Sequence, residues 1–211
     1  MDEVRPQGPG LVDTLSEVKK LKEQELLLLR KKLELKEKLP HLYGMPWYRW
    51  AWEFFNSRNR MSYLTAGNQL SKSSSQIRKC IHWATDKSLW AELWPTSLTQ
   101  PNAFWYFYPT LDVATDEFDL KWKLFLPKDK EDPVYGWKES YKNGKIDCIE
   151  FKSGVTVYFK SYAQNISDLQ TGSIYAVFAD EEMPLEYWPE IQARQSRHRP
   201  QSQALRCFGM Y

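Results

Sequence analysis

Two short segments of the sequence hold residues whose types and spacing suit the binding of a phosphorylated ligand. The first covers residues 66–73 and reads Ala-Gly-Asn-Gln-Leu-Ser-Lys-Ser. The phosphate-binding pattern Gly-x-x-x-x-Gly-Lys-Ser/Thr ends in a lysine and a hydroxyl, and Lys72 and Ser73 fill these positions. Ala66 and Ser71 stand where the pattern has glycines. The candidate nucleotide-binding residues are Ala66, Gly67, Asn68, Gln69, Leu70, Ser71, Lys72, Ser73 and Ser74.

The chemistry of such a loop depends mainly on its backbone, because N–H groups at a helix N-terminus bind phosphate whatever the side chain. We expect Lys72 to reach the β- and γ-phosphates and the Ser73 hydroxyl to ligate Mg²⁺. A residue with a Cβ at position 71 strains a turn that glycine makes freely. The alternative is an ordinary helix N-cap, in which Ser71 or Ser73 caps the helix and Lys72 points into solvent.

The second segment is an apolar run, Ile174–Ala179, that ends abruptly in Asp180, Glu181 and Glu182. In P-loop nucleoside triphosphatases such a strand places an aspartate beside Mg²⁺ at its carboxyl end. The next glutamate can act as the base that polarises the attacking water. The candidate metal ligands are therefore Ser73 and Asp180, and the candidate catalytic residues are Glu181 and Lys72. The alternative is a strand that simply ends in a polar turn.

An α/β fold would bring these two segments together. Strand-like runs and helical spacings alternate along the chain, which predicts a mainly parallel sheet flanked by helices, as in P-loop nucleoside triphosphatases. We expect the strands that end near Thr65 and Ala179 to be close neighbours in that sheet. The expected strands are 61–65, 104–108, 174–179 and 204–208, with a β-hairpin insertion at 146–151 and 155–159 and helices at 73–85, 112–126 and 184–197.

The N-terminal part of the chain has a different character. Residues 1–13 contain Pro6, Gly8, Pro9 and Gly10 and read as a flexible tail. Residues 14–40 are rich in Leu, Lys and Glu and predict a long charged helix. Its leucines form two competing stripes, which argues against a two-stranded coiled coil and favours packing of one leucine face on the domain or on a neighbour. The ATPase-type domain is expected at 41–211.

Composition excludes several other classes of protein. The net charge of +2 is too small to indicate nucleic-acid binding by itself. The three cysteines and three histidines are scattered, and no Cys-x-x-Cys pair indicates a zinc site. No segment has the length of apolar sequence that a membrane span needs.

The order of the motifs resembles that of terminase large subunits, the DNA-packaging motors of tailed bacteriophages. That family has an aromatic segment, a degenerate Walker A loop with Asn and Gln or Arg, and a Walker B strand that ends in acids and a proline. The resemblance covers roughly residues 43–211. It rests on the segments Trp52–Ser57, Leu64–Gln69, Lys72–Ser73, Phe151–Ser161, Leu169–Gly172 and Phe178–Pro184.

The resemblance implies a motor that hydrolyses ATP with Mg²⁺ and drives double-stranded phage DNA into the procapsid. Its partners would be DNA, the portal protein and the small terminase subunit, in a ring of identical subunits. It would work in the host cytoplasm, transiently on the procapsid and without a membrane. The C-terminal nuclease domain of the family is absent from these residues, so we expect no nuclease activity. The coupling motif of the family would fall near residues 208–211, where it is missing or incomplete.

The resemblance also implies an arginine at the developing charge of the γ-phosphate. Arg58, Arg60 and Arg78 could act within the subunit, and Arg194 and Arg197 on a neighbouring subunit. The sequence does not choose among them. The alternatives in function are a helicase-like DNA-translocating ATPase, a catalytically dead terminase-like scaffold that binds nucleotide or portal protein, and an interaction protein built around the N-terminal helix.

Overall fold

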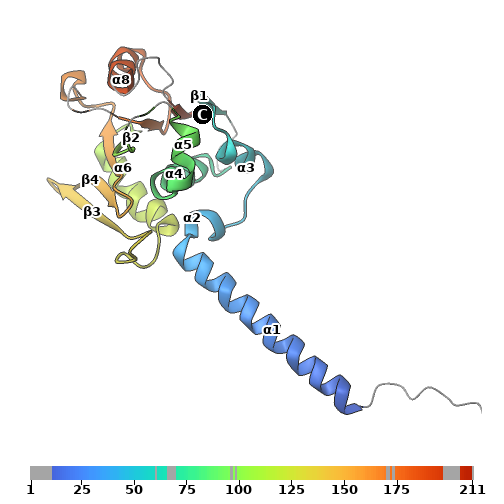
Figure 1. Cartoon of the computed structure of the whole chain (residues 1–211). Coiled ribbons are helices and arrows are strands. Elements are labelled where there is room, and N and C mark those ends of the chain that lie inside the picture. The colour runs from blue at the N-terminus through green and yellow to red at the C-terminus, as the bar shows by residue number, and fades with distance from the viewer. Residues whose placement is uncertain are drawn as a thin grey trace, which may run out of the picture.

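The computed structural model describes residues 11–59, 61–65, 70–95, 97, 99–169, 172, 174–196 and 205–210. The side chains of residues 11–15, 196 and 205–210 lie outside this description. The described part of the chain forms one α/β body from which a single long helix projects (Figure 1).

A seven-stranded sheet with the order β1-β7-β6-β2-β5-β4-β3 forms the centre of the body. The first five strands of this order run parallel, and β4 and β3 add an antiparallel edge. This confirms the predicted fold class. The strands are β1 (Met61–Thr65), β2 (Ala103–Tyr108), β3 (Trp137–Lys142), β4 (Lys145–Phe151), β5 (Thr156–Ser161), β6 (Ala176–Ala179) and β7 (Leu205–Met210).

Helices cover the sheet and connect its strands. The longer ones are α1 (Leu11–Lys38), α3 (Arg49–Asn56), α4 (Lys72–Thr85), α6 (Leu111–Glu117), which continues through the π-helical segment η2 (Phe118–Trp122) into α7 (Lys123–Phe125), and α8 (Trp188–Ser196). The short ones are α2 (Pro40–Tyr43), η1 (Lys87–Leu89), α5 (Trp90–Leu93), η3 (Ile166–Leu169) and η4 (Leu185–Tyr187). Among the described helices, none has both the length and the apolar character needed to cross a membrane.

Alternation of side chains along the strands divides the core into two layers. On one side of β2, Tyr106 and Tyr108 pack with Trp122 of η2 and with buried residues of α4. On the other side, Trp105 and Phe107 pack with residues of η4 and α8. Because neighbouring residues of β2 are aromatic on both faces, helices can cover both sides of the sheet, as parallel strands require.

The predicted hairpin is present, but it is part of the main sheet rather than an insertion. β4 and β5 are antiparallel, and β5 also pairs in parallel with β2 along its whole length. The sequence analysis missed β3, although Asn143-Gly144 marks its turn into β4. Both residues have positive φ, 52° and 75°, which is the conformation of a two-residue hairpin turn and the reason Asn-Gly is favoured there.

The N-terminal helix starts earlier than expected and does not pack along the domain. It begins at Leu11 rather than Thr14, because Pro9 and Gly10 are the last helix-breaking residues before it. Residues 1–10 of the expected tail lie outside the described part of the chain. The apolar side chains of α1 are 43% to 67% exposed from Val18 to Leu35, and Figure 1 shows the helix pointing away from the body. The leucine face of this helix therefore does not pack on the domain, and its packing on a neighbour stays a prediction.

Two buried basic residues of α4 anchor the preceding helices. The guanidinium of Arg78 donates to the backbone oxygens of His41, Leu42 and Met45 at 2.6–3.1 Å and lies 3.2 Å from the centre of the Trp47 ring. The ammonium of Lys79 donates to the carbonyls that end α3, those of Phe54 and Ser57, at 2.7 and 2.9 Å. Each cation therefore donates to carbonyl groups at or just beyond a helix end, where the helix itself supplies few N–H donors.

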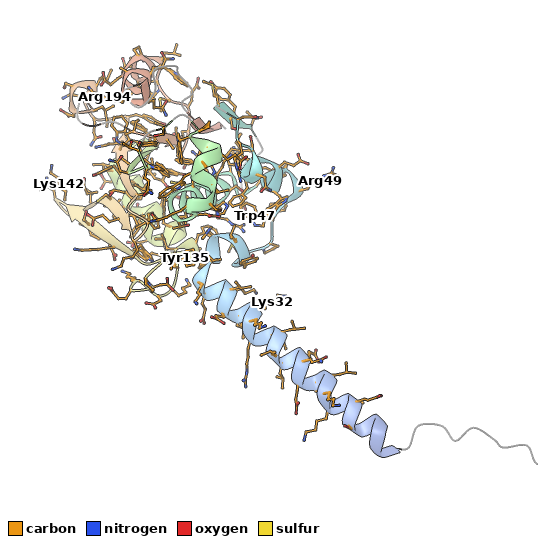
Figure 2. The ribbon with its side chains drawn as sticks, viewed as in Figure 1. Lys32, Trp47, Arg49, Tyr135, Lys142 and Arg194 are labelled. Carbon is orange, nitrogen blue, oxygen red and sulfur yellow. The ribbon has the colours of Figure 1, made fainter. Side chains whose placement is uncertain are left out.

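These contacts predict that Arg78→Ala lowers the free energy of unfolding by about 2–4 kcal/mol, because it leaves buried carbonyl groups without donors. The control is Arg49→Ala. Arg49 is 96% exposed and pairs only with Glu53 in the same helix (Figure 2), so its loss should change stability by less than about 0.5 kcal/mol. Urea unfolding followed by circular dichroism measures both, and equal effects of the two substitutions would contradict the anchoring role.

Candidate functional site

The two motifs meet where α4 begins and where β2 and β6 end. The Ser73 hydroxyl donates to Oδ1 of Asp180 at 2.9 Å, although 107 residues separate them in the chain. The backbone N–H of Asp180 donates to the carbonyl of Phe107 in β2 at 3.0 Å, which extends the pairing of β6 with β2 by one residue. The structure therefore brings the two candidate metal ligands into direct contact.

A second contact fixes α4 against the same strand end. The side-chain amide of Gln76 donates to the carbonyl of Ala179 at 2.9 Å in a buried position. Gln76 lies three residues after Ser73, so the two side chains share one face of the helix. The sequence analysis missed Gln76. The sequence feature that could have identified Gln76 is a polar side chain at helical spacing from Ser73, on the helix face that points to the sheet.

Ser71 occupies the strained position that the sequence indicated. Its φ and ψ are 61° and 30°, the left-handed region, and its side chain makes no capping hydrogen bond. Its carbonyl accepts both the N–H and the hydroxyl of Ser75. Because the Ser73 hydroxyl is bonded to Asp180, neither serine caps the helix with its side chain, and the ordinary N-cap interpretation is not supported.

The carboxylate of Asp180 is held in an environment that disfavours its charge. Burial is the largest influence and raises its pKa, and the nearby charges of Glu117 and Glu181 act in the same direction. The hydrogen bond from Ser73 and the charge of Lys121 lower it. The net shift is upward, so a cation bound at this carboxylate would stabilise its charged form.

Glu181 follows Asp180 in an unusual backbone conformation. Its φ is 78°, a value rarely adopted by residues other than glycine. Strained residues of this kind occur frequently at functional sites, where the surrounding structure holds them in place. Glu182 is exposed, in agreement with a role as surface charge.

The structure describes only part of the predicted phosphate-binding segment. Ala66, Gly67, Asn68 and Gln69 lie outside the described residues, while Leu70 is exposed and Lys72 and Ser74 are half-buried at the start of α4. The strands that end at Thr65 and Ala179 are not direct neighbours, because β7 lies between them.

The candidate arginines with described side chains are held by other groups. Arg58 donates to backbone oxygens at the end of α3 and pairs with Glu92. Arg78 anchors α2, and Arg194 pairs with Glu190 in the same helix. Arg60 and Arg197 lie outside the described residues.

Oxygen donors at this sheet edge suit Mg²⁺, which binds one or two protein groups and takes its other ligands from water and phosphate. Ser73 and Asp180 are such a pair. Within the described part of the chain, no group of three or more His, Cys, Asp or Glu side chains is placed to hold a metal ion. The residues therefore fit a metal that a bound nucleotide helps to hold, and do not fit a metal held by protein alone.

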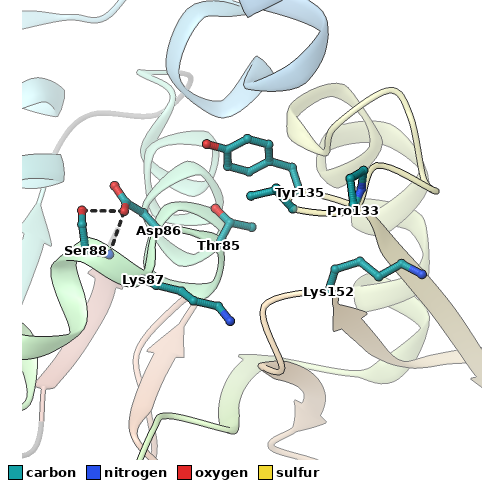
Figure 3. A pocket seen from close by; sticks show the side chains of 8 residues that line it. Thr85, Asp86, Lys87, Ser88, Pro133, Tyr135 and Lys152 are labelled. Carbon is teal, nitrogen blue, oxygen red and sulfur yellow. Dashed lines mark hydrogen bonds between the residues drawn. The ribbon is translucent and has the colours of Figure 1, made fainter.

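A cavity opens at the other end of α4, around Thr85, Asp86 and the facing loop residues Pro133, Val134 and Tyr135 (Figure 3). The Asp86 carboxylate accepts the N–H and hydroxyl of Ser88 there. This cavity lies at the C-terminal end of α4, so it is separate from the contact between Ser73 and Asp180.

Comparison of the whole fold points to one group of solved structures. The ATPase domain of the large terminase of Thermus phage P74-26 matches 84% of this chain and 68% of that domain, with a TM-score of 0.54 and 15% identity. The large terminase of a thermophilic bacteriophage matches with a TM-score of 0.52 and 15% identity, over 79% of this chain and 39% of that chain. The large terminase of bacteriophage HK97 matches with a TM-score of 0.51 and 10% identity, over 79% of this chain and 33% of that chain.

These likenesses show that the described chain has the fold of terminase ATPase domains. It spans well under half of the two longer terminase chains that it matches. No model of a protein family matches the sequence, and no curated protein matches it either. At 10–15% identity the likeness establishes the fold, and the function must be argued from the site.

The left-handed backbone predicts that Ser71→Gly raises the free energy of unfolding by about 0.5 kcal/mol, because it removes a steric cost of about 1 kcal/mol and adds some freedom to the unfolded chain. Ser74→Gly is the matched control. It places the same residue inside the helix, where it should lower stability by about 0.5 kcal/mol. Opposite signs in urea unfolding would support the strain at position 71, and equal losses would contradict it.

The raised pKa of Asp180 predicts that Asp180→Asn stabilises the protein without ligands at neutral pH. The buried charge disappears, while an amide oxygen still accepts from Ser73. The gain should appear as pH rises through the ordinary carboxyl range and be complete above the raised pKa of the folded state; it should vanish in acid, where Asp180 is protonated in both states. Thermal unfolding of both proteins across pH measures this, and a destabilised Asp180→Asn at neutral pH would contradict it.

Proposed function

We propose that this chain is the ATP-hydrolysing domain of a terminase large subunit, a motor that moves double-stranded phage DNA into a procapsid. The single observation that carries the proposal is the hydrogen bond between Ser73 and Asp180. It joins a helix start preceded by a left-handed residue to an acid at the end of a buried parallel strand, which is the arrangement that P-loop nucleoside triphosphatases use for Mg²⁺ and phosphate. The terminase fold and the order of the motifs support the choice of family.

In this proposal the chain's own groups bind ATP before any chemistry occurs. An α-helix leaves its first N–H groups without helical acceptors, so the first turn of α4 can bind phosphate oxygens. Lys72 adds a positive charge at the β- and γ-phosphates. Ser73 and Asp180 would hold Mg²⁺, which neutralises charge on the phosphates when it is bound.

Hydrolysis then needs a base beside the γ-phosphate. Glu181 takes a proton from the attacking water while the water oxygen bonds to the γ-phosphorus and the bond to the bridging oxygen breaks. ADP leaves with the electrons of that bond. Glu181 lies two residues beyond the end of β6, so its position depends on the same strand that places Asp180.

The proposal also includes the assembly of the motor and its partners. The motor would act as a ring of identical subunits on the procapsid, with DNA, the portal protein and the small terminase subunit as partners. Cleavage of DNA is not expected of these 211 residues, because two-metal cleavage needs several carboxylates around a metal pair about 4 Å apart. A dead scaffold would keep nucleotide binding and lack turnover.

The proposed roles predict different effects for two substitutions. Lys72→Ala should weaken ATP binding and turnover together, because the lysine contacts the phosphates. Glu181→Gln keeps the shape but removes the base, so it should leave ATP binding unchanged and lower turnover about 10²- to 10⁴-fold. Calorimetric titration with MgATP and phosphate release by the purified chain at high concentration measure both.

Glu182→Gln is the control, since the exposed side chain of Glu182 should be dispensable. Turnover by Glu181→Gln at the parental rate would remove Glu181 from the role of base. Nucleotide binding without turnover, in the unaltered chain and in the ring, would favour the dead scaffold. Loss of turnover by Glu182→Gln alone would make Glu182 the catalytic base and Glu181 the dispensable residue.

A further inference from the structure

An ion pair that was not expected from the sequence lies on the helix that follows β2. The ammonium of Lys121 is 2.7 Å from Oε2 of Glu117, one turn earlier in the helix. This helix starts directly after β2, where Thr110 caps α6 by accepting the N–H of Val113. Because β2 also holds the backbone of Asp180, α6 and the candidate metal ligand diverge from one edge of the sheet.

The pair differs from a second ion pair on the same helix, between Lys123 and Asp119. The side chain of Asp119 is 54% exposed, whereas that of Glu117 is 19% exposed and its Oε2 atom is shielded from solvent. The charges of Tyr141 and Glu139 in β3 act on Lys123, so this lysine faces the far edge of the sheet. The charges of Glu117 and Lys121 instead act on Asp180 and shift its pKa in opposite directions.

The winding of the helix differs at the residues between Glu117 and Lys123. Residues 118–122 form a π-helical turn, and within it the indole N–H of Trp122 donates to the hydroxyl of buried Tyr108 at 3.0 Å. The bond ties the wide turn to the carboxyl end of β2. Such π turns are rare and occur frequently at functional sites, where they re-aim side chains.

Phosphoryl transfer also needs a positive charge that the residues discussed so far supply only in part. Charge develops on the γ-phosphate in the transition state, and a cation beyond the loop lysine stabilises it. Arg58, Arg78 and Arg194 are held by other groups. Lys121 is partly exposed and carries its ammonium on a flexible four-carbon chain, so it can move between two acceptors.

We infer that Lys121 is a nucleotide-contacting residue, which exchanges Glu117 for the terminal phosphate when a nucleoside triphosphate occupies the site. The inference rests on the proposed function. Without nucleotide, Lys121 pairs with Glu117, and its charge also acts on Asp180. With nucleotide bound, its ammonium donates to a γ-phosphate oxygen, and Glu117 acts as a positioning residue that keeps it near.

The test compares Lys121→Ala with the matched control Lys123→Ala, which removes a lysine two residues away on the same helix. The probes are MgADP and MgADP with aluminium fluoride, which stands in for the phosphoryl group in transfer, and calorimetry measures their binding. Lys121→Ala should weaken binding of the fluoride complex about 10²-fold and that of MgADP far less, while Lys123→Ala leaves both unchanged. Equal binding of the fluoride complex by Lys121→Ala and the unaltered chain would overturn the inference.

Glu117→Gln separates a functional pair from a structural one. If Lys121 contacts phosphate, removing its competitor should leave binding of the fluoride complex unchanged or tighter. If the pair only stabilises the helix, Glu117→Gln and Lys121→Ala should weaken binding alike and lower the thermal midpoint alike, and that result would also overturn the inference. Failure of the unaltered chain to bind MgADP would defeat the proposed function together with the inference, whereas normal binding with no effect of Lys121→Ala would defeat the inference alone.

Discussion

The polar side chains along α4 are the constraint on which the arrangement of this protein depends. From its first turn to its third, the helix presents Ser73, Gln76, Arg78 and Lys79 to other elements, and each makes a hydrogen bond outside the helix. The first two bind the end of β6, and the basic pair binds the ends of α2 and α3. Buried polar groups are costly unless they are paired in good geometry, so α4 can take up only the position that satisfies all four.

This explains why the candidate site is formed although its parts are distant in the chain. Lys72 and Ser73 of the candidate phosphate-binding segment lie at the start of α4, and the acids follow β6. The contacts from Ser73 and Gln76 hold this helix against the end of that strand. Pairing of β6 with β2 then brings the start of α6 to the same edge, and the same continuous helix carries Glu117 and Lys121 farther along. Aromatic packing between Tyr106, Trp122 and Phe159 keeps α6 against the sheet.

Sequence reasoning reached the fold class and the two motifs because both depend on local patterns. An apolar run that ends in acids predicts a strand end, and a lysine followed by serines before a helical spacing predicts a phosphate-binding helix start. Contacts between residues that are distant in the chain leave no such local pattern in the sequence. The placement of β7 between β1 and β6, the burial of Arg78 and Lys79, and the effect of the Glu117 charge on the pKa of Asp180 are set by tertiary packing. Arg78 was a candidate for catalysis because the family resemblance implies an arginine at the γ-phosphate, whereas here backbone carbonyls in and just after a short helix bind it.

The same helix also relates the candidate site to α1. About 20 Å along the helix axis separates the first residue of α4 from its last, and Arg78 lies near the middle, where it binds α2. Only Leu39 lies between α2 and α1, and the carbonyl of Glu37 in α1 accepts the N–H of Lys128 from the loop after α7. The base of α1 is therefore fixed to the body from two directions, through α4 and through that loop. A change in the position of α4 relative to Asp180 would also move α2, because Arg78 bonds α2 directly and close-packed protein interiors transmit displacements.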